Sequence, residues 1–228
     1  GLYIPGGTAP LVSTAIMTAG LAKAAGVPQI VAVTPCGPDG SVNPALLTAL
    51  SLCGVSEIYR VGGAQAVAAL ACGTQTIRPV RKIFGPASVW VVEAKRQLFG
   101  EVAIDLLPGP SEVLVIADDS ARPNWIAADL LAQCEHGEGS TGVLLTDSER
   151  VLDAVASEIQ SQLESLSRKK ILAAAVRNLR LVLVKSMAEA ARLANAFAAE
   201  HVSIATREPG NIAACLNTSG ALFLGHHS

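Results

Sequence analysis

Short runs of aliphatic and β-branched residues alternate with longer Ala/Leu-rich helical patterns along almost the whole of this 228-residue chain. This alternation is the strongest constraint on the fold, because parallel strands need crossover connections that helices usually supply. The expected strands are Gln29–Val33, Glu57–Val61, Arg81–Phe84, Val102–Asp105, Val113–Ala117, Gly142–Leu145, Leu179–Val184, Val202–Ala205 and Ala221–Leu224. The expected helices are Leu11–Ala25, Pro44–Leu52, Ala64–Ala71, Ser88–Phe99, Asn124–Cys134, Ser148–Leu166, Met187–Ala199 and Asn211–Cys215, with a further helix before Arg177. The pattern predicts an α/β chain with mostly parallel sheets and helices on both faces.

A domain boundary is expected at Leu107-Pro108-Gly109-Pro110, where two prolines around a glycine interrupt the pattern between two strands. The boundary gives two domains, residues 1–109 and 110–228, of similar βα character. Half of the residues are hydrophobic and only 4% are aromatic, which favours helices packed closely on buried parallel sheets.

Charge and composition exclude several classes of function. The net charge is −2 and no basic stripe is present, so no nucleic-acid partner is expected. No apolar run reaches the roughly 18 residues of a membrane span. Five scattered cysteines without a CxxC pair indicate reduced thiols in a cytoplasmic protein. The chain begins with Gly and stops after ALFLG, so we expect both ends to be internal to a longer protein.

Three glycine-containing turns precede helices: Pro5-Gly6-Gly7, Gly62-Gly63 and Gly85-Pro86. Free N–H groups at helix N-termini suit phosphates, so the turns together are candidates for a dinucleotide site. Each turn alone is equally typical of ordinary βα connections. The dinucleotide fingerprint GxGxxG and the phosphate-loop motif GxxxxGK[ST] are both absent.

Gln133 and His136 stand three residues apart near the end of an expected helix and therefore share one face. An imidazole suits zinc and an amide oxygen can also coordinate a divalent metal. A histidine at a helix C-terminus can equally interact only with the helix dipole.

Glu200 and His201 stand where an Ala-rich helix passes into a strand. Histidine is the usual residue for proton transfer near neutral pH, and a neighbouring carboxylate can orient it. Adjacent strand residues point to opposite faces, so cooperation requires a bend at the junction. A solvated pair is the alternative.

Ser111 follows a rigid Pro-Gly-Pro turn and can bind substrate or cap backbone. No GxSxG elbow surrounds it, which argues against a serine nucleophile. His226 and His227 are adjacent and are expected to be exposed, because neighbouring histidines rarely bind one metal ion together.

Taken in order, GLYIPGGTAPLVST, VGGAQAVAALACGT, KIFGP, EAKRQ, DLLPGPSEVLVIAD, DLLAQCEHG, AEHVSIAT and LFLG resemble the histidinol dehydrogenase family nearly end to end. With the βα pattern, the resemblance implies two Rossmann-like domains, the second of them incomplete. It also implies an NAD-dependent, zinc-requiring oxidation of histidinol to histidine in histidine biosynthesis, by a homodimer.

The resemblance also implies roles for single residues. Tyr3, Gln65 and the position of Ser88 match positions that contact NAD. Ser111 matches a substrate-binding serine. Gln133 and His136 match two zinc ligands that also touch the substrate. Glu200 and His201 match the acid/base pair: His201 accepts the alcohol proton and binds substrate, and Glu200 activates water in the second oxidation.

Departures from the family pattern leave alternatives open. Ala87-Ser88 stands where the family has Gly-Asn, and Ala199 stands where proline is common. The remaining zinc ligands, an aspartate and a histidine donated across the dimer, would lie beyond Ser228. Two other hypotheses are therefore kept: a related dehydrogenase of another polar alcohol such as a sulfopropanediol, and a non-catalytic α/β module. We expect the chain alone to be inactive.

Overall fold

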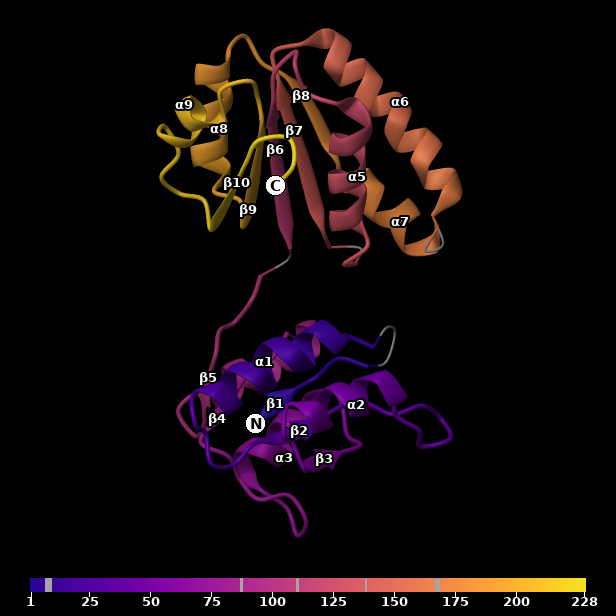
Figure 1. The fold of residues 1–228 in the computed structure, drawn as a ribbon, viewed down its shortest axis with the longest axis vertical. Coiled ribbons are helices and arrows are strands. Elements are labelled where there is room, and N and C mark those ends of the chain that lie inside the picture. The colour runs from indigo at the N-terminus through magenta and orange to yellow at the C-terminus, as the bar shows by residue number, and fades with distance from the viewer. Residues whose placement is uncertain (7–9, 87, 110, 138, 167–168) are drawn as a thin grey trace. The chain divides into compact units, whose positions relative to one another are not determined.

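The computed structural model describes residues 1–6, 10–86, 88–109, 111–137, 139–166 and 169–228 (Figure 1). It divides into two compact units, Gly1–Pro108 and Gly109–Ser228. Gly7, Ala87 and Pro110, which the sequence places in turns or at the domain boundary, lie outside the described residues.

The first unit is built on short parallel strands. The strands are β1 (Leu2–Tyr3), β2 (Val31–Val33), β3 (Glu57–Tyr59), β4 (Lys82–Ile83) and β5 (Ala103–Ile104). The helices are α1 (Val12–Ala24), α2 (Pro44–Leu52), α3 (Ala64–Cys72) and α4 (Val89–Leu98). β1, β2 and β3 pair in that order and β4 pairs with β5, all in parallel. A parallel bridge between Leu2 and Phe84 joins the two groups, so the spatial order is β3-β2-β1-β4-β5.

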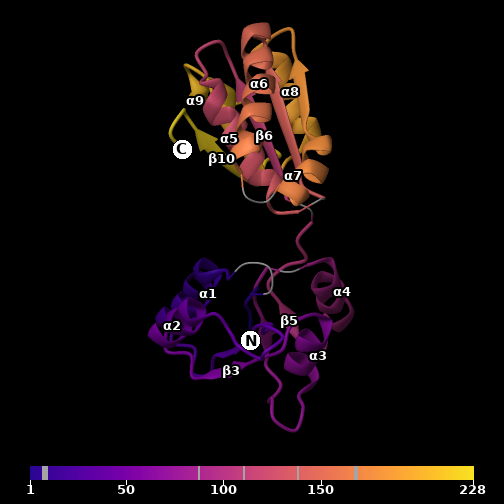
Figure 2. The ribbon, with the colours of Figure 1, turned by 90° about the vertical axis from the view of Figure 1, so that its right-hand side faces the viewer.

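Helices cover both faces of this arrangement (Figure 2). Leu2, Ile4 and Ala32 pack against α1 and α2 on one face. Val31 and Val33 pack against α3 and α4 on the other face. Strands buried on both faces explain why the sequence shows continuous apolar runs rather than alternation.

The second unit holds one five-stranded, fully parallel sheet of order β10-β9-β6-β7-β8. Its strands are β6 (Glu112–Ala117), β7 (Thr141–Thr146), β8 (Arg180–Leu183), β9 (His201–Ala205) and β10 (Ala221–Leu224). Its helices are α5 (Pro123–Cys134), α6 (Glu149–Ser165), α7 (Lys169–Ala175), the 3-10 turn η1 (Val176–Asn178), α8 (Met187–Phe197) and α9 (Pro209–Ala213). Counted along the chain, both units have the same strand order: third, second, first, fourth, fifth.

The sheet of the second unit is also covered on both faces (Figure 1). Val113, Val115 and Ala117 of β6 pack against α5 and α6. The alternate residues Leu114 and Ile116 pack against α8. The α/β class with parallel sheets and helices on both faces, predicted from the sequence, is thus confirmed. Among the helices drawn in the described part, none is long and apolar enough to cross a membrane.

Most element boundaries agree with the sequence within two residues, and two differences are informative. Strand β1 was not predicted, because two residues at the start of a chain show no periodicity. Helix α8 ends at Phe197 instead of Ala199, because Ala198 takes a left-handed conformation with φ of 55°. Ser148 and Ser186 cap α6 and α8, accepting hydrogen bonds from the N–H groups of Val151 and Glu189.

Asp118 fastens the turns that follow β6 and β9 to each other. Its carboxylate accepts hydrogen bonds from the Ser120 N–H and hydroxyl, at 2.9 and 2.5 Å, and from the Arg207 N–H, at 2.9 Å. Partial burial raises the pKa of Asp118, but these hydrogen bonds outweigh burial and hold the pKa of this carboxyl below its ordinary value. A carboxylate whose pKa is lower folded than unfolded stabilises the fold above its unfolded pKa, and this contribution is lost as pH falls through the folded pKa.

Replacing Asp118 with alanine is therefore expected to lower the free energy of unfolding by about 1–3 kcal/mol at neutral pH. The difference in unfolding free energy between the wild type and the variant should shrink in acid, because protonation of the Asp118 carboxylate weakens its hydrogen bonds in the wild type. Urea unfolding at neutral and acidic pH measures both values. Asp119→Ala is the matched control, since the Asp119 carboxylate makes an exposed 3.4 Å ion pair with Arg207 and the substitution leaves the Asp119 carbonyl in place. An equal effect of the two substitutions would contradict the role of Asp118.

Candidate functional site

Three residues expected to contact a dinucleotide lie at the carboxyl edge of the first unit's strands. Tyr3 is the last residue of β1, Gln65 is in the first turn of α3 after β3, and Ser88 precedes α4 after β4. In a parallel arrangement the carboxyl ends of all strands meet at one edge. β1 and β4 are neighbours here. The chain continues from β1 to a helix on one face and from β4 to a helix on the other face. Ligands of open α/β sheets bind at such a reversal of strand order.

Tyr3 connects β1 to the start of α3. Its buried side chain reaches Gly63, and the Gly63 N–H donates to the Tyr3 hydroxyl at 3.0 Å. Gly63 is the N-cap of α3 and has φ of 73°, a conformation that disfavours any side chain. Gln65, two residues later, is exposed at the same helix end. The structure thus brings Tyr3 and Gln65 together.

Gly85 brings the turn after β4 against the end of β1. The Tyr3 N–H donates to the Phe84 carbonyl at 2.7 Å. A Cβ on Gly85 would stand 2.0 Å from the Tyr3 carbonyl oxygen, and the φ of Gly85 is 134°. Only glycine fits, so the chain leaves β4 through a residue that lies directly beside Tyr3.

Two helix N-termini face this edge without side-chain caps. Neither Gly63 at α3 nor Ser88 at α4 gives its helix a side-chain hydrogen bond. Backbone N–H groups at a helix N-terminus and the positive end of the helix dipole attract anions such as phosphates. This edge therefore has the chemistry of a dinucleotide site, built from a tyrosine, an amide and two helix ends.

The candidate catalytic residues lie in the second unit, at the amino edge of its sheet. Ser111 directly precedes β6, and His201 is the first residue of the neighbouring strand β9. His201 pairs in register with Val113, so its side chain lies on the sheet face that α5 covers. By strand alternation Ser111 belongs to the same face. Gln133 and His136 stand at the end of α5 over this edge.

Gln133 and His136 offer two donor groups for a metal. Gln133 is buried and its amide nitrogen has no hydrogen-bond partner among the described residues. Turning the amide by 180° would place its oxygen there, so this end of the side chain is free to coordinate. His136 is exposed just beyond α5. Two such ligands fit a zinc site in part, since tetrahedral zinc needs four.

The described residues hold no cluster of three or more His, Cys, Asp or Glu side chains that could bind a metal. Cys134, between the two candidate ligands, is buried against Leu172 and Ala175. Burial raises the pKa of the Cys134 thiol to about 11, so it is neutral at physiological pH and is a core residue.

A bend at the junction of α8 and β9, the condition stated above for cooperation, brings the side chains of Glu200 and His201 together. The left-handed Ala198 turns the chain out of α8 just before β9. The Glu200 carboxylate then lies 3.7 Å from Nδ1 of His201, and the two side chains are 53% and 39% exposed. The Phe223 ring of β10 lies 5.8 Å from the imidazole. Both groups are accessible and neighbouring, as an acid/base pair must be.

Gly220 is a site-supporting residue that the sequence did not reveal. A Cβ at Gly220 would stand 2.7 Å from the Glu200 carbonyl oxygen. The N–H groups of Gly220 and Ala221 donate to the carbonyls of Ala199 and Glu200, at 3.2 and 2.9 Å. This close backbone pairing fixes the start of β9. The only sequence signal is an isolated glycine before a strand.

His226 and His227 follow β10 and therefore lie at the opposite, carboxyl edge of the sheet. The His227 ring packs edge-on against Trp125 in the first turn of α5, with centroids 4.8 Å apart. Gln133 lies eight residues farther along this helix, about 12 Å at 1.5 Å per residue. His227 accordingly takes no part in a metal site with Gln133.

Comparison with known proteins gives a consistent result. A family model described as histidinol dehydrogenase matches residues 1–228. The histidinol dehydrogenase of Rhizobium meliloti is 52% identical over 229 residues, which is 100% of this chain and 52% of that protein. That of Bradyrhizobium diazoefficiens is also 52% identical, and the alignment covers 53% of it. The chain thus spans about half the length of the curated relatives it matches.

Among solved structures, the histidinol dehydrogenase of Elizabethkingia anophelis matches with a TM-score of 0.95 at 41% identity, over 100% of this chain and 53% of that one. An acetylating aldehyde dehydrogenase from Geobacillus thermoglucosidasius matches with a TM-score of 0.63 at 16% identity, over 99% and 64% of the two chains. The second likeness shows a shared fold alone.

Proposed function

Because the chain belongs to the histidinol dehydrogenase family, we propose that the full-length protein oxidises L-histidinol to L-histidine through histidinal, with two NAD molecules and one water. The observation that carries the proposal is the pairing of Glu200 with an accessible His201 at the edge where Ser111, Gln133 and His136 also lie. The reaction belongs to histidine biosynthesis.

We further propose that the units are Rossmann-like domains with divided tasks. Their common strand order, third-second-first-fourth-fifth, supports this assignment. Residues 1–109 would bind NAD through Tyr3, Gln65 and Ser88. Residues 110–228 would hold the substrate, the metal ligands and the proton-transfer groups.

The proton chemistry follows from the second unit. In the first oxidation the alcohol carbon gives a hydride to NAD and the hydroxyl proton goes to the imidazole of His201. In the second, the Glu200 carboxylate would remove a proton from the water that attacks the aldehyde carbon, and the hydrate anion that forms would become the carboxylic acid by giving a hydride to a second NAD. Ser111 would bind the substrate through its hydroxyl, and the buried Gln133 would fix one end of it.

Gln133 and His136 would hold zinc, which when bound would position the substrate and, as a Lewis acid, stabilise negative charge on its oxygen. The family resemblance implies that the other ligands lie beyond Ser228 and on a second subunit, so we propose that the full-length protein is a homodimer. His201 would also contact the bound substrate.

Two substrates separate the proposal from its nearest alternative. The full-length protein should reduce NAD with histidinol and not with dihydroxypropanesulfonate, and NADH absorbance measures both reactions. Turnover of the sulfonate alone would replace the proposed function with a related dehydrogenase activity. No turnover of either by the zinc-loaded dimer would favour the non-catalytic module.

Zinc removal and titration distinguish the chain from the full-length protein. The chain described here should bind zinc weakly, because two ligands cannot close a four-coordinate site. The full-length dimer should bind it stoichiometrically and lose activity when a chelator removes it. Calorimetric titration measures both affinities. Tight, stoichiometric zinc on the chain alone would contradict the two-ligand description, and His227→Asn controls for adventitious binding by the C-terminal histidines.

A further inference from the structure

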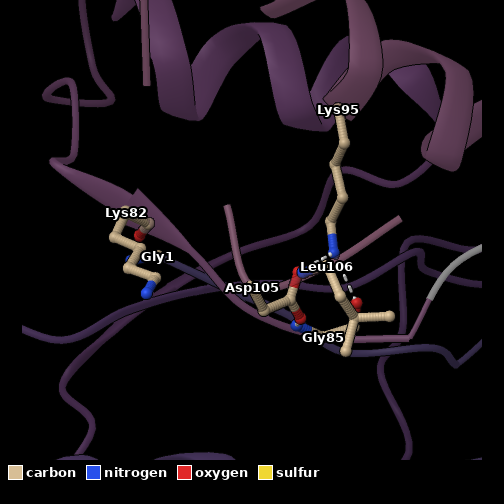
Figure 3. Close-up of polar contacts among 6 residues, drawn as sticks. All are labelled: Gly1, Lys82, Gly85, Lys95, Asp105 and Leu106. Carbon is tan, nitrogen blue, oxygen red and sulfur yellow. Dashed lines mark hydrogen bonds and ion pairs between the residues drawn. The ribbon is translucent and has the colours of Figure 1, made fainter. Parts of the chain in front are cut away.

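Lys95 is an unusual residue in the first unit. Among the side chains that the structure describes, it is the only charged one that is buried, with 0% of its surface exposed. It extends from α4 toward the turn after β4, as Figure 3 shows. Burying an ammonium group costs several kcal/mol unless its partners compensate. The groups that Lys95 contacts therefore indicate which role its burial serves.

The Lys95 ammonium has two partners, both at 2.7 Å. It donates to the carboxylate of Asp105 and to the carbonyl oxygen of Gly85 (Figure 3). The other oxygen of Asp105 accepts from the Gly85 N–H, also at 2.7 Å. One ion pair thus binds both backbone polar groups of Gly85, its N–H through Asp105 and its carbonyl through Lys95.

Three elements hold Gly85 in place: the end of β5, helix α4 and strand β1. Asp105 directly follows β5, whose residues pair with β4. Its carboxylate also accepts from the Leu106 N–H at 2.7 Å, and the Asp105 N–H donates to the Ile83 carbonyl at 3.0 Å. Lys95 comes from the buried face of α4, one turn after Val91. Gly85 itself lies against the Tyr3 carbonyl.

Gly85 begins the connection that ends at Ser88, the N-cap of α4. A neutral turn in a strand-to-helix connection needs no buried charge, and apolar replacements of buried ion pairs often preserve or raise stability. The ion pair is therefore better explained by a need to fix the backbone conformation of Gly85 than by a gain in stability. It holds the backbone conformation with φ of 134° that places the turn beside Tyr3.

We propose that Lys95 and Asp105 are positioning residues for dinucleotide binding, which hold the backbone of Gly85 beside Tyr3 in the conformation that receives NAD. This inference rests on the proposed function only in that NAD is the ligand of this edge. Neither residue touches the cofactor. Both act through the backbone of Gly85, and their removal weakens NAD binding without removing any group of the acid/base site.

Lys95→Met in the full-length protein tests this, because methionine keeps the length of the side chain without its charge. The Kd for NAD, measured by calorimetry, should rise at least about tenfold, the equivalent of the 1.4 kcal/mol that one charge-assisted hydrogen bond provides. The KM for NAD should rise with it, while kcat at saturating NAD changes much less. Arg96→Met is the matched control: Arg96 is the next residue of α4, and its ion pair with Glu93 is exposed. Its Kd should equal that of the wild type.

A double variant separates positioning from stability. Lys95→Met with Asp105→Asn buries no net charge, so it should fold with a Tm close to that of the wild type. Under the positioning role its Kd for NAD stays raised, because the Gly85 carbonyl still has no donor. Recovery of both Tm and NAD affinity would overturn the proposal and leave a purely structural ion pair.

Hydrogen exchange on the wild-type protein gives a readout that needs no variant. NAD should slow exchange of the backbone amides between residues 84 and 92, and unchanged exchange there would also overturn the proposal. If the wild type binds NAD without oxidising histidinol, the proposed function fails and this inference stands. If Lys95→Met binds NAD as tightly as an active wild type, the inference fails alone.

Discussion

Replacing His201 with asparagine in the full-length protein is expected to lower kcat for histidinol oxidation by about 10²–10⁴-fold, the usual contribution of a positioned general base. Asparagine has a similar size and keeps a polar group next to Glu200 but cannot take up the alcohol proton. The first unit is untouched, so the Kd for NAD should not change. Initial rates of NADH formation and calorimetric titration with NAD measure the two quantities.

His227→Asn is the matched control for this substitution. His227 belongs to the same unit but packs on Trp125 at the other edge of the sheet. We expect its kcat to stay close to that of the wild type. Equal losses in the two variants would show that imidazole removal acts through stability, and an unchanged kcat in His201→Asn would remove His201 from the reaction.

The Glu200→Gln variant is expected to separate the two oxidations. Glutamine retains the shape of the side chain but cannot accept a proton from water, so oxidation of the aldehyde should slow by about 10²–10⁴-fold. Oxidation of histidinol to the aldehyde should slow far less, because in the proposed mechanism that proton goes to His201. NADH formed per histidinol should therefore fall from two toward one.

Histidinol and histidinal supplied separately provide this measurement. Glu208→Gln is a suitable control, because Glu208 stands beyond the other end of the same strand, β9. An equal slowing of both oxidations in Glu200→Gln would contradict the division of roles and would indicate that Glu200 mainly orients the imidazole, 3.7 Å away.

The existence and type of most elements followed from the sequence because each depends on local periodicity. The structure shows Ser148 and Ser186 as the N-caps of α6 and α8, two of the helices that the periodicity predicted. Strand order was not predictable, because the apolar runs of parallel strands are alike and carry no information on which strands pair. The placement of His227 far from Gln133 depends on that order and emerged only from the structure.

The candidate site also has features that the sequence indicated and features that it did not. The family resemblance implied Tyr3, Gln65 and His201 as candidates, whereas the contacts around them could not be predicted from the sequence. Gly220 is one small residue before a strand, and its role depends on a backbone from another strand. Lys95 stands between Glu93 and Arg96, which form an exposed ion pair, so its charged neighbours give no sign of its burial. Its place four residues after the buried Val91, on the apolar side of α4, was the one available signal.

The parallel sheet of the second unit separates in space the residues proposed for catalysis from contacts that stabilise the fold. Its amino edge carries the residues assigned to chemistry, whereas its carboxyl edge carries the Asp118 network and the His227–Trp125 contact. Stabilising substitutions usually reduce activity when they stiffen a catalytic region. Substitutions intended to raise heat resistance should therefore be placed at the carboxyl edge, where they leave the amino edge unchanged. Sequence differences among relatives should be judged separately at the two edges.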